Sequence, residues 1–211
     1  MINSKRKYSH ITPRYIFNRI LQWNYERTHK DLPWLNKNGN EYLEKIICKD
    51  WRVVEFGGGR SSSFFLKKVQ KLIIIEHDYK YYNKIKENNS KHIDSNQFEI
   101  YNLKKKEEFL NFINNLDAQS LDLVFVDSIF RYLVTSTILD KIKINGFLIL
   151  DNINRFVPTN TFTPIDSGRK EKEFLNSEWE KLFKEKLLEK YSLKITSDGI
   201  SDTGFFIKKH N

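Results

Sequence analysis

A glycine-rich turn that follows an apolar segment is the first feature of this sequence that could do chemistry. Residues 52–56 predict a short strand, and Gly57, Gly58 and Gly59 come directly after it. Glycines let the backbone turn sharply and approach a ligand closely, and the start of the helix expected next presents free N–H groups. Glu76 ends a second apolar segment, where a carboxylate can accept both hydrogen bonds of a ribose diol. Together these features predict a nucleoside site.

Two carboxylates and an amide form a second group. Asp127 follows the apolar segment 121–126, and Asp151 and Asn152 follow the segment 147–150. Neighbouring parallel strands end at the same edge of a sheet, where ligands bind, so we expect Asp127 and Asp151 to be catalytic. Carboxylate and amide oxygens also suit Mg²⁺ or Ca²⁺, which makes these three residues a candidate metal site. The alternative is that Asp127 contacts only a cofactor while Asp151 and Asn152 cap a helix.

The elements that must position these residues alternate between strands and helices after residue 50. Strands are expected at 52–56, 72–75, 98–101, 121–126, 147–150, 193–196 and 204–207. Helices are expected between them, including 132–144, closed by Asn145-Gly146, and 171–190. The last two strands are close enough to pair as an antiparallel hairpin. The fold class is therefore α/β, with a doubly wound, mostly parallel seven-stranded sheet and a C-terminal antiparallel hairpin.

Two segments lie outside this alternation. Residues 1–50 predict an N-terminal helical extension, with helices near 15–27 and 40–48, and residues 51–211 predict the main domain. The aromatic and basic residues of the N-terminal extension include Trp23, Arg27, His29 and Trp34, and they either form a lid over a site or pack in the core. The segment 153–170 is long for a connection in a compact domain, and we expect it to close over a ligand.

The glycine-rich turn resembles the first motif of class I S-adenosylmethionine-dependent methyltransferases, which have a Rossmann-like fold. Residues 54–61 carry this resemblance together with Ile75-Glu76-His77-Asp78, which is similar to the ribose-binding acidic motif of that family. Ser62 stands where a dinucleotide site would have its third glycine, which disfavours a nicotinamide oxidoreductase. The resemblance implies S-adenosylmethionine as cofactor, with Glu55 facing its sulfonium end. It implies these cofactor-binding residues: Glu55, Gly57, Gly58, Gly59, Ser61, Glu76, His77 and Asp127.

The second group of residues resembles the metal ligands of catechol O-methyltransferase-type enzymes. This partial resemblance implies that Mg²⁺ bound by Asp127, Asp151 and Asn152 would hold an acceptor oxygen near the sulfonium. That family has a lysine base shortly after the first aspartate, whereas this sequence has none between Ser128 and Tyr132. Two alternatives stay open: a cation activates the acceptor hydroxyl without help from a lysine, or there is no cation and the carboxylates act directly.

Composition sets the remaining expectations. The 211 residues carry a formal charge of +9, spread along the chain, so nucleic acid is not the favoured partner. One cysteine and no apolar run of membrane-spanning length indicate a cytoplasmic protein with no membrane span. The predicted function is O-methylation of a small metabolite or of a sugar or glycan precursor. RNA methylation and a catalytically silent Rossmann-like binding protein are the alternatives.

Overall fold

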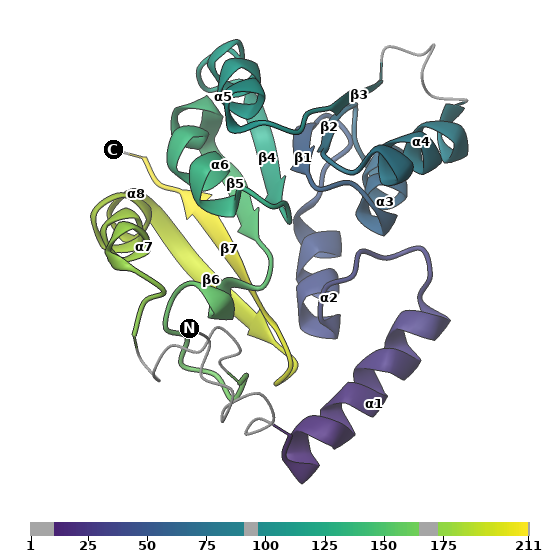
Figure 1. Ribbon diagram of the computed structural model, residues 1–211, viewed down its shortest axis with the longest axis vertical. Coiled ribbons are helices and arrows are strands. Elements are labelled where there is room, and N and C mark those ends of the chain that lie inside the picture. Colours follow the sequence, from purple (N-terminus) through teal and green to yellow (C-terminus); the bar gives the residue numbers. More distant parts are fainter. Residues whose placement is uncertain (1–10, 91–96, 165–172, 211) are drawn as a thin grey trace.

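One seven-stranded sheet organises the molecule (Figure 1). The computed structural model describes residues 11–90, 97–164 and 173–210. The strands are β1 (Arg52–Phe56), β2 (Lys71–Glu76), β3 (Phe98–Asn102), β4 (Leu121–Val126), β5 (Ile142–Leu150), β6 (Tyr191–Ser197) and β7 (Asp202–Lys208). Their order in the sheet is β3-β2-β1-β4-β5-β7-β6; β7 runs antiparallel to β5 and to β6, and the other four pairings are parallel. The predicted sheet and its closing hairpin are confirmed.

Helices cover both faces of the sheet. They are α1 (Pro13–Thr28), α2 (Lys37–Ile46), α3 (Arg60–Lys68), α4 (Tyr79–Asn88), α5 (Lys106–Asn114), α6 (Arg131–Thr137), α7 (Ser177–Lys181) and α8 (Leu188–Lys190). A π-helical stretch, Leu182–Leu187, joins α7 to α8, and short 3₁₀ turns occupy Leu139–Lys141 and Ile153–Arg155. One apolar core lies between the sheet and α5, α6 and α7, and a second lies between the sheet and α2, α3 and α4. In the described ranges, no helix is both long enough and apolar enough to cross a membrane.

The two N-terminal helices differ in how they attach to the sheet. Asn36 caps α2 by accepting a hydrogen bond from Gly39 N (2.8 Å), and its Nδ2 donates to the carbonyl of Thr196 in β6 (3.2 Å). Leu43 of α2 is completely buried in the second core. In contrast, α1 begins at Pro13 behind a Thr12 cap, and Gln22 is its one buried residue in the described structure. Figure 1 shows α1 at the periphery of the molecule, below the strands.

The helix predicted over 132–144 is shorter than expected, and the sequence interpretation of Asn145-Gly146 is wrong. The helix α6 ends at Thr137, and β5 already begins at Ile142, so both residues lie inside a strand. Asn145 has a φ of 62°, and the register between β4 and β5 shifts at this point. Asn tolerates the left-handed conformation, so the pair that reads as a helix end here produces an irregularity within the strand.

The helix predicted over 171–190 begins later than expected. Asn176 caps it by accepting a hydrogen bond from Trp179 N (2.9 Å), so the helix starts at Ser177. Residues 171 and 172 lie outside the described residues. The apolar residue Phe174 belongs to the periodic pattern but packs near Phe183 from outside the helix, with ring centroids 5.7 Å apart.

The described part of the long connection after β5 is anchored to β7. Thr159, Thr161 and Thr163 donate their hydroxyl hydrogens to the carboxylate of Asp202, which is completely buried. Asp202 N in turn donates to Asn154 Oδ1 (3.1 Å). A buried carboxylate is stable only where such donors surround it, so these threonines hold the connection in place. The prediction that the connection closes over a ligand extends to residues 165–170, which lie outside the described residues.

Candidate functional site

The carboxyl ends of three neighbouring strands bring together residues that are far apart in the sequence. Phe56, Val126 and Leu150 are aligned in the sheet, at the ends of β1, β4 and β5. The ladder continues one step further, because Asp127 N donates to the carbonyl of Phe56 (2.8 Å) and Asp151 N donates to that of Val126 (3.1 Å). The turn at Gly57 and the two aspartates therefore lie side by side, as the sequence predicted.

The first residue of the glycine-rich turn has no space for a side chain. Gly57 has a φ of +92°, and a Cβ there would lie 2.1 Å from the carbonyl oxygen of Asp127. The turn therefore needs glycine both for its left-handed backbone and for its contact with the end of β4. Gly59 differs, because a Cβ there would meet no atom within 4 Å.

Glu55 lies beneath this turn and is completely buried. Its two carboxylate oxygens accept hydrogen bonds from the hydroxyl groups of Ser61 and Ser62, the latter at 2.6 Å. Ser62 Oγ also accepts a hydrogen bond from Gly59 N (3.0 Å). Burial raises the pKa of Glu55 to about 7, although the two serine hydroxyls oppose that rise. These contacts assign Glu55 and both serines to the support of the turn.

A cavity of about 280 Å³ opens above the turn. The predicted residues that line it are Gly57, Gly58, Gly59, Ser61, Glu76, His77, Asp127 and Asp151. The other lining residues are Trp34, Arg60, Asp78, Tyr81 and Phe125. Seven of the eight predicted cofactor-binding residues thus meet at one cavity, and Glu55 is the exception because it lies below the surface.

Glu76 is positioned in this cavity by the turn that follows β2. Its Oε1 accepts a hydrogen bond from Asp78 N (2.7 Å) and lies 3.0 Å from His77 Nδ1. Among the described residues, the one hydrogen bond to this carboxylate is on Oε1, and none involves Oε2. A carboxylate with one oxygen fixed and one available is suited to bind hydroxyl groups of a ligand.

Asp151 is buried at the end of β5 and held on both oxygens. Thr203 Oγ1 donates to Oδ1 (2.8 Å), and Asn152 Nδ2 donates to Oδ2 (2.9 Å). Burial, together with the nearby carboxylate of Asp127, raises the pKa of Asp151 to about 7. Asp127 is more exposed and pairs with Arg131 of α6, whose guanidinium also donates to the carbonyl of Ser128 (2.9 Å). The guanidinium of Arg131 therefore pairs with a carboxylate of this protein, Asp127.

The arrangement of these side chains gives no support to the predicted cation. Both oxygens of Asp151 accept hydrogen bonds, Oδ1 of Asp127 is bound by Arg131, and Asn152 turns its nitrogen toward Asp151. Within the described ranges, no group of three His, Cys, Asp or Glu side chains is placed to hold a metal. The geometry thus gives no support to Mg²⁺ at Asp127, Asp151 and Asn152, because three of the four carboxylate oxygens already have hydrogen-bond partners.

A second cavity, of about 530 Å³, adjoins the first. It shares Trp34, Asp127 and Asp151 with the first. Its other lining residues come from α1, the segment after β5 and the β6–β7 turn: Tyr15, Arg19, Gln22, Glu26, Asn152, Arg155, Asp198, Ile200 and Ser201. Asp198 Oδ1 accepts from Ile200 N (2.8 Å) and Ser201 N (2.9 Å), whereas its buried Oδ2 has no partner in the described structure.

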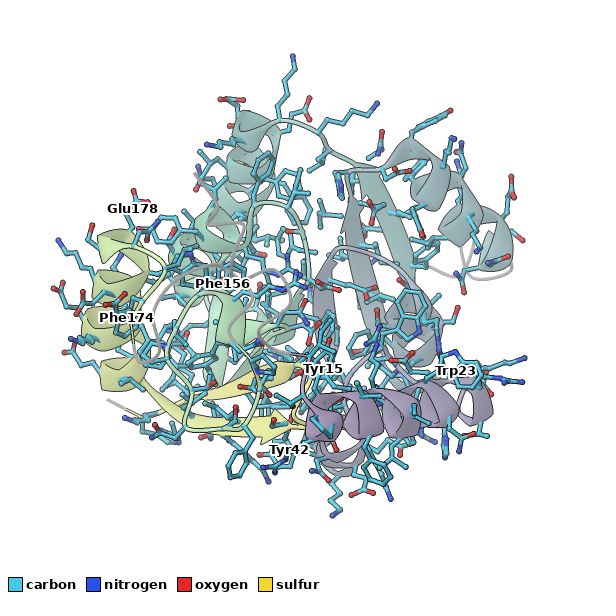
Figure 2. All side chains as sticks on the ribbon, turned by 60° about the horizontal axis from the view of Figure 1, so that its bottom comes forward. Tyr15, Trp23, Tyr42, Phe156, Phe174 and Glu178 are labelled. Carbon is cyan, nitrogen blue, oxygen red and sulfur yellow. The ribbon has the colours of Figure 1, made fainter. Side chains whose placement is uncertain are left out.

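The N-terminal segment contributes to this cavity through one residue that the sequence analysis named, Trp34, and through several that it did not name. Trp34 lines both cavities and is 64% exposed, so it is not a core residue. Trp23 is 56% exposed and lines neither cavity described here. Sequence reasoning missed Arg19 and Glu26, which follow Tyr15 at helical spacing of four and eleven residues and share its face of α1. That spacing could have predicted that these residues lie on one face of the helix. Figure 2 shows α1 in the lower part of the view, with Tyr15 and Trp23 labelled.

Comparisons with solved structures find this fold in methyltransferases. A Klebsiella pneumoniae protein provisionally assigned as an O-methyltransferase is 14% identical, with 94% of this chain and 91% of that chain covered and a TM-score of 0.59. A Staphylococcus aureus protein provisionally assigned as a caffeoyl-CoA O-methyltransferase is 17% identical, with 95% of each chain covered and a TM-score of 0.57. A Clostridium thermocellum protein provisionally assigned as an rRNA methylase is 12% identical, with 82% and 94% covered and a TM-score of 0.57.

Sequence comparisons find no related protein family. No family model matches the chain, and no curated protein does. The strand order, the antiparallel β7 and the solved structures agree with one another, and the chain has the Rossmann-like fold of the class I methyltransferases.

Proposed function

We propose that this protein is an S-adenosylmethionine-dependent methyltransferase that methylates a hydroxyl oxygen of a small polar acceptor. The observation that carries the proposal is the pair of cavities that meet at Asp127, Asp151 and Trp34. A transfer enzyme needs a donor site and an acceptor site whose reacting atoms face each other across a short distance. The first cavity has the glycine-rich turn and the carboxylate that suit a nucleoside donor, and the second is lined mainly by polar groups.

In the donor cavity, the ribose would bind Glu76 and the methionine end would lie along Gly57 to Gly59. Oε2 of Glu76 is available for the ribose hydroxyls because Oε1 is held by Asp78 N. Glu55 supports the turn from below, through Ser61 and Ser62, and would act on the sulfonium end only through its charge. S-adenosylmethionine supplies the electrophilic methyl group.

In the acceptor cavity, Asp151 would take the proton. S-adenosylmethionine bound in the donor cavity would supply the methyl group and keep the electron pair of the broken carbon–sulfur bond, and Asp151 would accept the hydroxyl proton of the acceptor. A pKa of about 7 makes Asp151 a stronger base than an ordinary carboxylate, and Thr203 and Asn152 fix its orientation. Residues 1–50 would form the outer wall of this cavity through α1, as a lid segment beside the main domain of residues 51–211.

The acceptor is expected to carry several hydroxyl groups, as a sugar, a glycan precursor or a polyhydroxylated metabolite does. Glu26, Asp198 and Asp151 offer hydrogen-bond acceptors, and Arg19 offers donors. RNA is the weaker candidate because carboxylates from α1, β4, β5 and the β6–β7 turn would repel phosphate groups. A panel of hydroxylated metabolites, sugar nucleotides and total RNA, tested with radiolabelled S-adenosylmethionine, would identify the class.

Calorimetry with S-adenosylhomocysteine tests the donor site. Glu76→Ala should weaken binding by roughly 10- to 100-fold, which corresponds to about 1.5–3 kcal/mol for hydrogen bonds to a charged group. Glu99→Ala is the matched control, because Glu99 lies on the neighbouring strand β3 and pairs with Lys71 (2.5 Å), away from both cavities. Binding of NADH but not of S-adenosylhomocysteine would overturn the proposal. Cofactor binding without turnover on any acceptor would favour the silent binding protein.

A further inference from the structure

The polarity of α1 is opposite to that of a helix that packs on a core. Its exposed side carries five large apolar side chains: Ile16 (48% exposed), Phe17 (61%), Ile20 (59%), Leu21 (52%) and Trp23 (56%). At 100° per residue these five lie on one arc, and we call this arc the outer face of α1. Ile11 and Phe162, 48% and 76% exposed, are further exposed apolar residues nearby, since Phe162 lies under Arg14 of the helix.

The opposite face of α1 is polar and points to the protein. Tyr15, Arg19, Gln22 and Glu26 lie on it and line the second cavity. Gln22 Nε2 donates to the carbonyl of Leu35 (3.2 Å) and to Glu26 Oε1 (3.0 Å), which fixes this face against the body of the molecule. The helix therefore cannot rotate to bury its apolar residues without removing the wall of the cavity. Exposed apolar patches of this kind mark interaction surfaces.

The charged residues of α1 that contact aromatic rings beside the outer face are both arginines. Arg14 lies over the ring of Phe162 (3.8 Å) and Arg27 lies over the ring of Trp23 (4.5 Å), so both guanidinium groups border the apolar residues. The only acidic residue of α1 is Glu26, which is on the cavity side. An apolar arc with arginines beside it and a tryptophan at its edge has the side chains that can lie in the interface of a lipid bilayer.

We propose that the outer face of α1 binds the surface of an anionic membrane. The ligand is the lipid surface itself, with the apolar side chains between the acyl chains and the arginines at the phosphate groups. A second copy of the chain fits less well, because it would bring the same arginines together in a protein of net charge +9. One helix of 16 residues is also a narrow strip, about 24 Å long, against the roughly 800 Å² that each partner buries in a stable dimer.

Vesicle binding tests this proposal. The full chain should sediment with vesicles of one part phosphatidylglycerol to two parts phosphatidylcholine, and much less with phosphatidylcholine alone. The double variant Phe17→Ser/Ile20→Ser should bind the anionic vesicles at least about tenfold more weakly. The matched control is Ile144→Ser/Leu188→Ser, which removes two apolar residues of 41% and 42% exposure from β5 and α8 and should bind normally. High salt should weaken the binding of the unchanged chain.

A spectroscopic readout locates the contact. Trp23 is on the outer face, so its fluorescence should shift to the blue with anionic vesicles. The variant Trp23→Phe should lose that shift, although Trp34, which is also exposed, still contributes fluorescence. Circular dichroism melting should give the same Tm for both double variants, since their side chains are exposed. The proposal is overturned if anionic vesicles do not bind the chain, or if the α1 variant binds them as tightly as the control. A dimer that sedimentation velocity detects and the α1 variant loses would assign the face to a second copy instead.

Discussion

At the scale of single residues, the buried carboxylates determine how this protein responds to pH. Glu55 and Asp151 both have a pKa raised to about 7 by burial, from 4.5 and 3.8. The folded chain therefore holds their protons at pH values where the unfolded chain has lost them. Stability from this source is complete below about pH 4, and it falls as pH rises toward about 7.

Glu55→Gln should reduce this pH dependence. The amide keeps the shape of the side chain and has no proton to lose, so the variant should gain on the order of 3 kcal/mol relative to wild type at pH 8 compared with pH 4. Urea unfolding at the two pH values measures the difference. Glu108→Gln is the control, because Glu108 is exposed and its pKa is lowered by the backbone N–H groups of Lys105 and Lys104. An unchanged slope in Glu55→Gln would show that Glu55 is ionised in the folded protein.

The second prediction at this scale concerns Asp151 as the base. Asp151→Asn should lower turnover by at least about 100-fold while the affinity for S-adenosylhomocysteine stays within about threefold. Turnover of the unchanged protein should rise with pH through about 7, because only the ionised carboxylate accepts a proton. EDTA should leave turnover unchanged, since both oxygens of Asp151 and Oδ1 of Asp127 already have hydrogen-bond partners. Loss of activity in EDTA with recovery in Mg²⁺ would restore the metal hypothesis.

At the scale of the elements, sequence patterns predicted the strands better than the ends of helices. The strands β1, β2 and β4 are largely apolar segments, because they are buried on both faces, and such segments are readily recognised as strands. Asn145-Gly146 misled because the same residues suit a helix end and a strand irregularity, and only the pairing of β5 with β4 decides between them. The contacts of Glu55 with Ser61 and Ser62 depend on side-chain geometry after the turn has formed, which no spacing rule specifies.

The glycine-rich turn gives a prediction at the same scale. Gly57→Ala should destabilise the protein by about 2 kcal/mol or more, because the left-handed backbone is strained and the new methyl group meets the carbonyl of Asp127. Gly59→Ala is the matched control two residues later, where a methyl group has open space. Thermal unfolding of the two variants measures the difference. Equal stability would show that the end of β4 can move away from the turn.

At the scale of the whole molecule, the site is assembled from the sheet and from a segment that precedes it in sequence. The sheet supplies the glycine-rich turn, Glu76 and the two aspartates, and these could be predicted because strand ends in an α/β fold are fixed by topology. The acceptor wall depends on how α1 docks, through Gln22 and the carbonyl of Leu35, and no period in the sequence encodes that docking. The same helix carries both the cavity wall and the outer face.

Arg60 connects these two parts. It begins α3 directly after the glycine-rich turn and lines the donor cavity, and its guanidinium donates to the carbonyls of Glu26 (3.3 Å) and His29 at the last turn of α1. A cation there also complements the negative end of the helix. A ligand in the donor cavity that restricts the motion of Arg60 therefore also restricts the motion of α1, which forms the wall of the second cavity. In kinetic terms, we expect an ordered reaction in which the donor binds first and its spent form leaves last.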